Sequence, residues 1–313
     1  MLFILHDLFM KKITGYVKDY FIGVDKRILL LSAAFIAVAI FCNYRFHLNR
    51  MAAHMSDPAQ YLYWYFVFLL AFSVPYLLYD LFGLHRPFIH SGFIILFFIA
   101  PLLFSWKMVY DIDFSFSGSA AQNIYWNQVI YWPFKLLVIT VSIFLLWSMT
   151  RKDGEPLYGI STRNFRPAPY LVMLLLMVPL IAAASTQKDF LAMYPKLKNI
   201  AFLKGVQGHG WYKLLYELSY GSDFISIELF FRGFLVLAFV KWFGRDAILP
   251  MACFYCTIHF GKPLGECISS FFGGLILGVV TYHTRTIFGG LIVHLGIAWL
   301  MELGGYLGNS FFR

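Results

Sequence analysis

The chain has 313 residues, of which 60% are hydrophobic and 13% are charged, and its formal net charge is +9 at pH 7. Soluble domains have about one half apolar and about one quarter charged residues, so this composition excludes an ordinary soluble protein. The excess of Lys and Arg indicates orientation in a membrane, and we expect no nucleic-acid partner. The predicted fold class is all-α, a polytopic helical bundle in a lipid bilayer.

A helix of roughly 20 apolar residues crosses the hydrocarbon core of a bilayer, and the chain has apolar segments for about eight or nine such helices. In chain order we expect them at residues 28–44, 61–82, 92–106, 129–149, 170–185, 224–242, 248–260, 267–282 and 287–303.

This order of segments divides the chain into three regions. Residues 1–27 form an amphipathic, cytoplasmic segment, for which a disordered tail is the alternative. Residues 28–222 hold the first transmembrane helices and a long loop at 186–222, and residues 223–313 form a helical core of the catalytic type. No secretory signal peptide opens the chain. Basic residues gather before the first span, between the fourth and fifth, and after the sixth, which places the N-terminus in the cytoplasm.

The long loop carries several glycines among aromatic residues. We expect it to be a lid or a substrate-contacting loop, or else an amphipathic connector. Two shorter patterns indicate packing. Cys253 and Cys256 are read as small buried residues and not as a metal or redox pair, and Gly274 and Gly278 let two helices approach closely.

Two opposite charges lie inside the apolar run from residue 224 to residue 240. Glu228 and Arg232 are four residues apart, so in a helix they share one face and each can neutralise the other. Ionisable groups at membrane depth are costly, and they usually face a bundle interior with a functional task. Taken alone, the pair is also explained as an ion pair that only holds helices together.

Two histidines lie in later apolar segments. His259 comes just before Gly261 and Pro263, which end its helix, so we expect its imidazole near a helix end that faces a cavity or an interface. His294 lies within its segment, where a neutral imidazole is the expected form. A lone buried histidine is more often a hydrogen-bonded core residue than a ligand. Together with the charged pair, the two histidines favour a site built by three helices.

These residues occur in three motifs whose order resembles that of a known family. Glu228 to Gly233 is similar to the second Glu, the Arg and the Gly of the family's Glu-Glu-x-x-x-Arg-Gly motif. Tyr255 and His259 are similar to its aromatic residue and His, and His294 is similar to the His of its last conserved helix. The family is that of the CPBP proteins (CAAX protease and bacteriocin-processing, or Abi, proteins). Over residues 224–303 the chain resembles its type II CAAX prenyl endopeptidases.

The resemblance implies an intramembrane endopeptidase that hydrolyses a peptide bond in a membrane-associated peptide or protein. It implies catalytic roles for Glu228, Arg232, His259 and His294. A carboxylate and His259 would orient and deprotonate a water, and His294 would polarise the scissile carbonyl. A divalent metal, with zinc as the first choice, would be held by Glu228, His259 and His294. The second motif resembles that of bacterial members of the family, which implies a location in the bacterial cytoplasmic (inner) membrane.

The chain departs from the family pattern at two positions. Ile227 stands where the family has its first Glu, which activates the water. Ala298 stands where the family commonly has Asn. If the chain is an enzyme, its catalytic carboxylate would be that of Glu228, after a rotation of the helix by about 100°. Alternatively it would be that of Glu266 or Glu302. The alternative is a catalytically inactive CPBP-fold scaffold or partner-binding protein, and a transporter is the third hypothesis.

Overall fold

The computed structural model describes residues 2–150, 156–163, 165–200, 202–205 and 209–311, and within these ranges every regular element is a helix. Six helices are long and apolar enough to cross a membrane: Lys26–Arg45 (α2), Asp57–Leu81 (α4), Ser91–Val109 (α5), Ala120–Thr150 (α6), Leu264–Thr284 (α13) and Phe288–Phe311 (α14). The all-α membrane bundle is confirmed. The predicted count of eight or nine spans is not.

Three of the predicted spans are not single helices long enough to cross a membrane. The fifth is α7 (Ala168–Ala184), and the seventh is α12 (Ile248–Thr257), a helix of 10 residues that is too short to cross a bilayer alone. The sixth is divided among α10 (His209–Glu228), the π-helix η3 (Leu229–Ala238) and α11 (Val240–Phe243).

The expected loop at 186–222 is therefore shorter than predicted. It contains α8 (Lys188–Met193), η2 (Lys196–Asn199) and α9 (Phe202–Gly205), and from residue 209 onward the chain is already in α10. The first turns of α10 carry polar residues, so a hydropathy ruler does not register them as part of a span. The predicted boundary between residues 222 and 223 falls inside this continuous helix.

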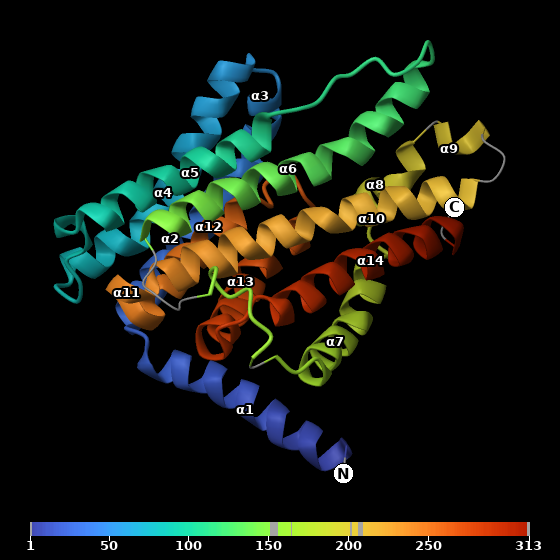
Figure 1. The fold of residues 1–313 in the computed structure, drawn as a ribbon. Helices are drawn as coiled ribbons and strands as arrows, with labels where there is room; N and C mark the ends of the chain where they lie inside the picture. Colours follow the sequence, from blue (N-terminus) through green and yellow to red (C-terminus); the bar gives the residue numbers. More distant parts are fainter. Residues whose placement is uncertain (1, 151–155, 164, 201, 206–208, 312–313) are drawn as a thin grey trace.

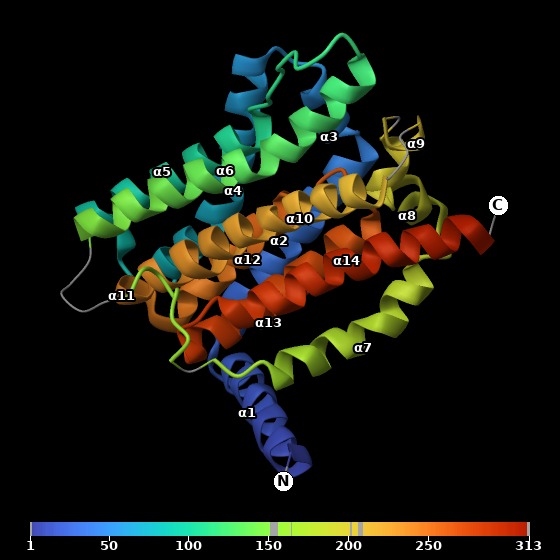
Figure 2. The same cartoon turned by 45° about the vertical axis from the view of Figure 1, so that its right-hand side comes forward.

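The first helix, α1 (Leu2–Gly23), replaces the alternative of a disordered tail. It extends at a steep angle from the bundle, next to α7 and α13 (Figures 1 and 2). Tyr16 stacks on His283 with ring centroids 4.1 Å apart, and Arg245 donates a hydrogen bond of 2.7 Å to the Gly23 carbonyl. These contacts attach α1 to the bundle at two points. Short elements complete the chain: α3 (Leu48–Ala53), η1 (Pro87–Ile89) and η4 (Gly244–Ala247).

The short helix α12 lies at the centre of the bundle, in contact with α2, α4, α13 and the π-helix (Figure 2). All 10 of its residues are buried. Glycines on α13 permit this packing, because a Cβ at Gly278 would lie 2.6 Å from the Met251 side chain and one at Gly274 would lie 3.4 Å from the Ala252 Cα. The predicted packing role of both glycines is confirmed.

Candidate active site

The helix that precedes His259, α12, ends at Thr257. His259 lies in the turns after α12, where its N–H donates to the Cys256 carbonyl at 3.1 Å. Gly261 has a φ of 91°, a conformation that favours glycine, and a Cβ there would lie 2.6 Å from Asn49 Nδ2. Pro263 then precedes α13. This turn places the imidazole of His259 at a helix end, as predicted.

A connected polar network joins the predicted site residues. Glu228 Oε1 lies 2.9 Å from His294 Nδ1 and 3.2 Å from Arg232 Nη1. The other nitrogen of His294, Nε2, lies 3.0 Å from the Tyr255 hydroxyl. The Arg232 guanidinium stacks over the Tyr255 ring, with its carbon 4.2 Å from the ring centroid. The network therefore spans the end of α10, the π-helix, α12 and α14.

Hydrogen-bond chemistry assigns the protons along this network. An ionised carboxylate only accepts, so with Glu228 ionised beside Arg232 the Nδ1 of His294 carries the hydrogen. In a neutral imidazole the other nitrogen is then an acceptor, so the Tyr255 hydroxyl donates to it. Glu228 thus fixes the tautomer of His294, and His294 in turn fixes the orientation of the Tyr255 hydroxyl. Both nitrogens of His294 are occupied.

His259 is arranged differently. Its Nδ1 lies 3.0 Å from the Tyr255 backbone carbonyl, and because a carbonyl only accepts, this nitrogen is the donor. Its Nε2 then carries a lone pair, and among the described residues it has no hydrogen-bond partner. His259 lines a cavity inside the bundle. The residue that carries this lone pair is therefore part of the cavity wall.

The cavity has a volume of about 800 Å³ and lies among α5, α6, α7, α10, α12, α13 and α14. Tyr255, His259, His294 and Arg232 share its wall. Arg232 is 0% exposed, and within the described part of the chain its three guanidinium nitrogens have no hydrogen-bond acceptor. Its charge is paired with Glu228 alone, so its donors remain available to a ligand that reaches them.

Ile227 and Glu228 point in different directions from α10, about 100° apart. Ile227 lines the cavity, whereas Glu228 is fully buried behind it and is not part of the wall. The rotation that would bring Glu228 to the family's first Glu position has therefore not occurred. Ala298 also lines the cavity, where it offers no hydrogen-bonding group.

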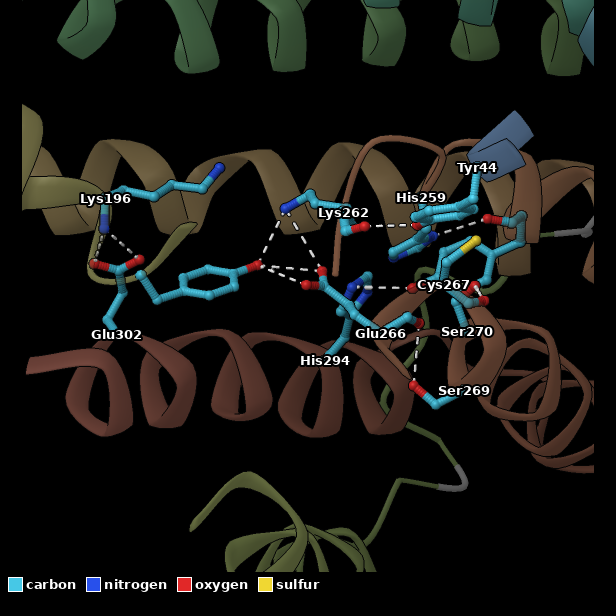
Figure 3. Close-up of polar contacts among 12 residues, drawn as sticks. Tyr44, Lys196, His259, Lys262, Glu266, Cys267, Ser269, Ser270, His294 and Glu302 are labelled. Carbon is cyan, nitrogen blue, oxygen red and sulfur yellow. Dashed lines mark hydrogen bonds and ion pairs between the residues drawn. The ribbon is translucent and has the colours of Figure 1, made fainter. Parts of the chain in front are cut away.

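The two other acids considered from the sequence hold a segment in place. Residues 188–199, which we call the strap, cross one end of the cavity. Glu302 accepts the backbone N–H of Lys196, with its oxygens at 3.0 and 2.8 Å. Glu266 accepts from the Tyr194 hydroxyl, with both oxygens at 3.1 Å, and pairs with Lys262 at 3.5 Å (Figure 3). Glu302 is thus a buried anchor, and Glu266 lines the cavity.

The predicted zinc ligands are brought together but are already engaged. Both nitrogens of His294 and one oxygen of Glu228 bind protein groups, and the Arg232 cation lies beside that carboxylate. Among the described residues no group of three or more His, Cys, Asp and Glu side chains is arranged to hold a metal ion. A tetrahedral zinc does not fit the donors as they lie here.

One glycine keeps the carboxylate of Glu228 in its place. A Cβ at Gly290 would lie 2.2 Å from Glu228 Oε2. We expect Gly290→Ala to lower the free energy of unfolding by about 1–3 kcal/mol, because the carboxylate has no free space to move into. Chemical unfolding in detergent micelles measures this. Gly210→Ala, whose Cβ would meet nothing within 4 Å, is the control and should leave stability unchanged or slightly higher. Equal stability of both variants would contradict the tight fit.

Sequence reasoning missed two groups that contribute to the site. Tyr255 was noted for its ring, but its hydroxyl is the group that links His294 to the cavity. Tyr194 comes from the strap, where no motif marks it, and its hydroxyl joins Glu266 to Lys262. Glu266, which is partly exposed, gave only a weak signal, since an acid in the first turn of a helix is common for electrostatic reasons alone.

Comparison with known families agrees with this geometry. Residues 221–300 match the family described as type II CAAX prenyl endopeptidase Rce1-like. This segment contains the network of Glu228, Arg232, Tyr255, His259 and His294. No curated protein and no solved structure matches the chain. The family match confirms the resemblance predicted from the sequence: in residues 221–300 this chain is similar to the CPBP family of membrane endopeptidases.

Proposed function

We propose that the chain is an intramembrane endopeptidase of the CPBP type, which hydrolyses a peptide bond in a membrane-associated polypeptide. Its proposed location is the cytoplasmic membrane of a bacterium. One observation carries the proposal: His259, Tyr255 and Arg232 line one cavity inside a bundle of membrane helices. A base, a hydroxyl donor and a buried cation are the groups that peptide hydrolysis requires.

His259 is the proposed general base. Its Nε2 takes a proton from a water in the cavity while the water oxygen bonds to the scissile carbonyl carbon. The protonated imidazole then gives that proton to the leaving amine, and the C–N bond breaks to yield a carboxylic acid and an amine, between which the acid proton is then transferred. The carbonyl that accepts from Nδ1 keeps the ring oriented throughout both transfers.

Tyr255 is the proposed donor to the oxyanion that forms on the carbonyl oxygen. Its hydroxyl hydrogen points to His294 in the free protein and reorients to the oxyanion when the tetrahedral intermediate appears. Arg232 supplies a positive charge beside the ring. In this mechanism Glu228 and His294 are positioning residues, because they act on substrate only through Tyr255.

The test is a mass-spectrometric census of new peptide termini in membranes of cells that lack the protein. The cells are complemented with the native chain, with His259→Ala, or with His54→Ala, an exposed histidine outside the cavity. We expect specific cleavages to return with the native chain and with His54→Ala, and not with His259→Ala at equal expression. The termini that return also name the substrate.

A second function is favoured by Ile227, which presents an apolar side chain to the cavity where the family has a carboxylate. In that case the chain is a noncatalytic member that binds a membrane polypeptide without cleaving it. The same census separates the two functions. Identical termini in all three strains, together with a restored phenotype, would support the binding protein and contradict the protease.

A further inference from the structure

The strap presents a cation to the cavity. Lys196 lines the wall, and its ammonium lies 4.7 Å from the centroid of the Tyr220 ring. Among the described residues this ammonium makes no hydrogen bond and no ion pair. A lysine that is placed in a cavity without an anionic partner is a binding group for an anion of a ligand.

Three carboxylates near Lys196 are committed to other groups, and a fourth, Glu217, makes no hydrogen bond to the ammonium. Glu302 accepts a hydrogen bond from the backbone N–H of Lys196, but the Glu302 oxygens are not bonded to the Lys196 ammonium. Asp223 pairs with Lys107 at 2.7 Å, and Glu266 binds Tyr194 and Lys262.

Lys262 approaches the same space from the other side. Figure 3 shows the ammonium groups of Lys196 and Lys262 directed toward one region, at the end of the site nearest Glu302. Burial is the largest cause that lowers the pKa of Lys196 to about 8, and the charge of Lys262 is the second. An anion bound between the two ammonium groups would offset both the cost of their burial and their mutual repulsion.

The charges of the whole wall favour an anion. Basic side chains on the wall number five, and acidic ones number three: Lys107, Lys135, Lys196, Arg232 and Lys262 against Asp189, Asp223 and Glu266. Glu228 lies behind the wall and pairs with Arg232, so four basic groups remain against three acidic ones. Much of the remaining wall is apolar. Leu180 of α7 and Phe272 of α13 line the cavity and are also 62% and 55% exposed, so this apolar part reaches the outer face of the bundle. The cavity therefore suits a ligand that is apolar along its length and negatively charged at one point.

We propose that Lys196 and Lys262 form a subsite that binds a carboxylate of an apolar peptide. The carboxylate comes either from the C-terminus of the peptide or from an acidic side chain within it. This subsite rests on the proposed function for its peptide ligand, but it makes Lys196 a specificity-determining residue from outside the segment that matches the family.

The experiment measures binding and not cleavage. The His259→Ala protein is purified in detergent micelles and titrated into short fluorescein-labelled apolar peptides, with binding followed by fluorescence anisotropy. One pair of peptides differs only in a free carboxylate or a carboxamide at the C-terminus. A second pair is amidated and differs only in an internal Glu or Gln. Each titration is repeated with Lys196→Met, Lys196→Arg and Lys188→Met in the same background. Lys188 is the matched control, since it is exposed on the strap and outside the cavity.

We expect the charged member of one pair to bind at least about tenfold more tightly than its neutral partner, as a charge-assisted hydrogen bond in a cavity allows. Lys196→Met should abolish this ratio, and Lys196→Arg and Lys188→Met should keep it. The pair that shows the ratio identifies the source of the carboxylate.

Three results would overturn the subsite: equal binding within both pairs, a ratio that survives in Lys196→Met, or no binding of any peptide. Because this background is inactive by design, these results are independent of whether the native chain cleaves peptides. A correct fold of each variant is checked by its unfolding midpoint.

Discussion

Tyr255→Phe is expected to lower kcat by roughly 10²–10³-fold, which is the loss found when one donor to an oxyanion is removed. The ring remains, so its stacking with Arg232 and its place in the cavity wall are kept. The lost hydroxyl acts mainly in the transition state, and KM should therefore change little. The measurement is the steady-state cleavage of the peptide that the census of termini identifies, with the purified protein in detergent micelles.

Tyr76→Phe is the matched control. The Tyr76 hydroxyl is buried, has no hydrogen-bond partner among the described residues and does not line the cavity. Its removal should leave kcat unchanged. If Tyr255→Phe keeps the native kcat, another group stabilises the oxyanion. If it loses activity together with its fold, the unfolding midpoint will show it, since His294 Nε2 would then lack its donor at a cost of about 1–3 kcal/mol.

The sequence predicted the fold class because membrane helices follow from composition and length alone. Segments such as α2 and α5 were placed to within a few residues, since nothing but lipid and neighbouring helices surrounds them. The prediction failed at α10 and α12. The first turns of α10 carry polar residues, and α12 is a short helix enclosed by protein. Hydropathy describes a helix in lipid and is a poor guide to a helix enclosed by others.

The residues proposed from the sequence lie close together in the structure, but the sequence did not predict most of the contacts that join them. The i,i+4 spacing of Glu228 and Arg232 predicted their ion pair, because that contact lies within one helix. The sequence gives no means to learn that Glu228 turns away from the cavity and Ile227 toward it, since a one-residue difference in helix rotation depends on packing. Contacts between distant segments, such as that of Tyr194 with Glu266, depend on how the strap crosses the bundle.

Glu228→Ala is expected to lower the free energy of unfolding by roughly 3–5 kcal/mol, because it leaves the guanidinium of Arg232 buried without a counter-charge. Both side chains are 0% exposed, so water does not replace the lost carboxylate. His294 Nδ1 loses its acceptor in the same substitution. Unfolding in detergent micelles, followed by the loss of helical circular dichroism, measures the change. Asp80→Ala removes an exposed acid and should stay within about 0.5 kcal/mol of the native protein.

A double variant separates the ion pair from simple loss of packing. Glu228→Ala combined with Arg232→Met removes the stranded charge, so it should be more stable than Glu228→Ala alone. If the double variant is instead less stable by the sum of the two single effects, the residues do not interact and the pair is not what holds Arg232 in the membrane interior. Cleavage by the double variant separates the structural role of Glu228 from its role in the reaction. A double variant that recovers stability but not cleavage would mean that Glu228 is needed to orient His294 and Tyr255, as the hydrogen-bond network requires.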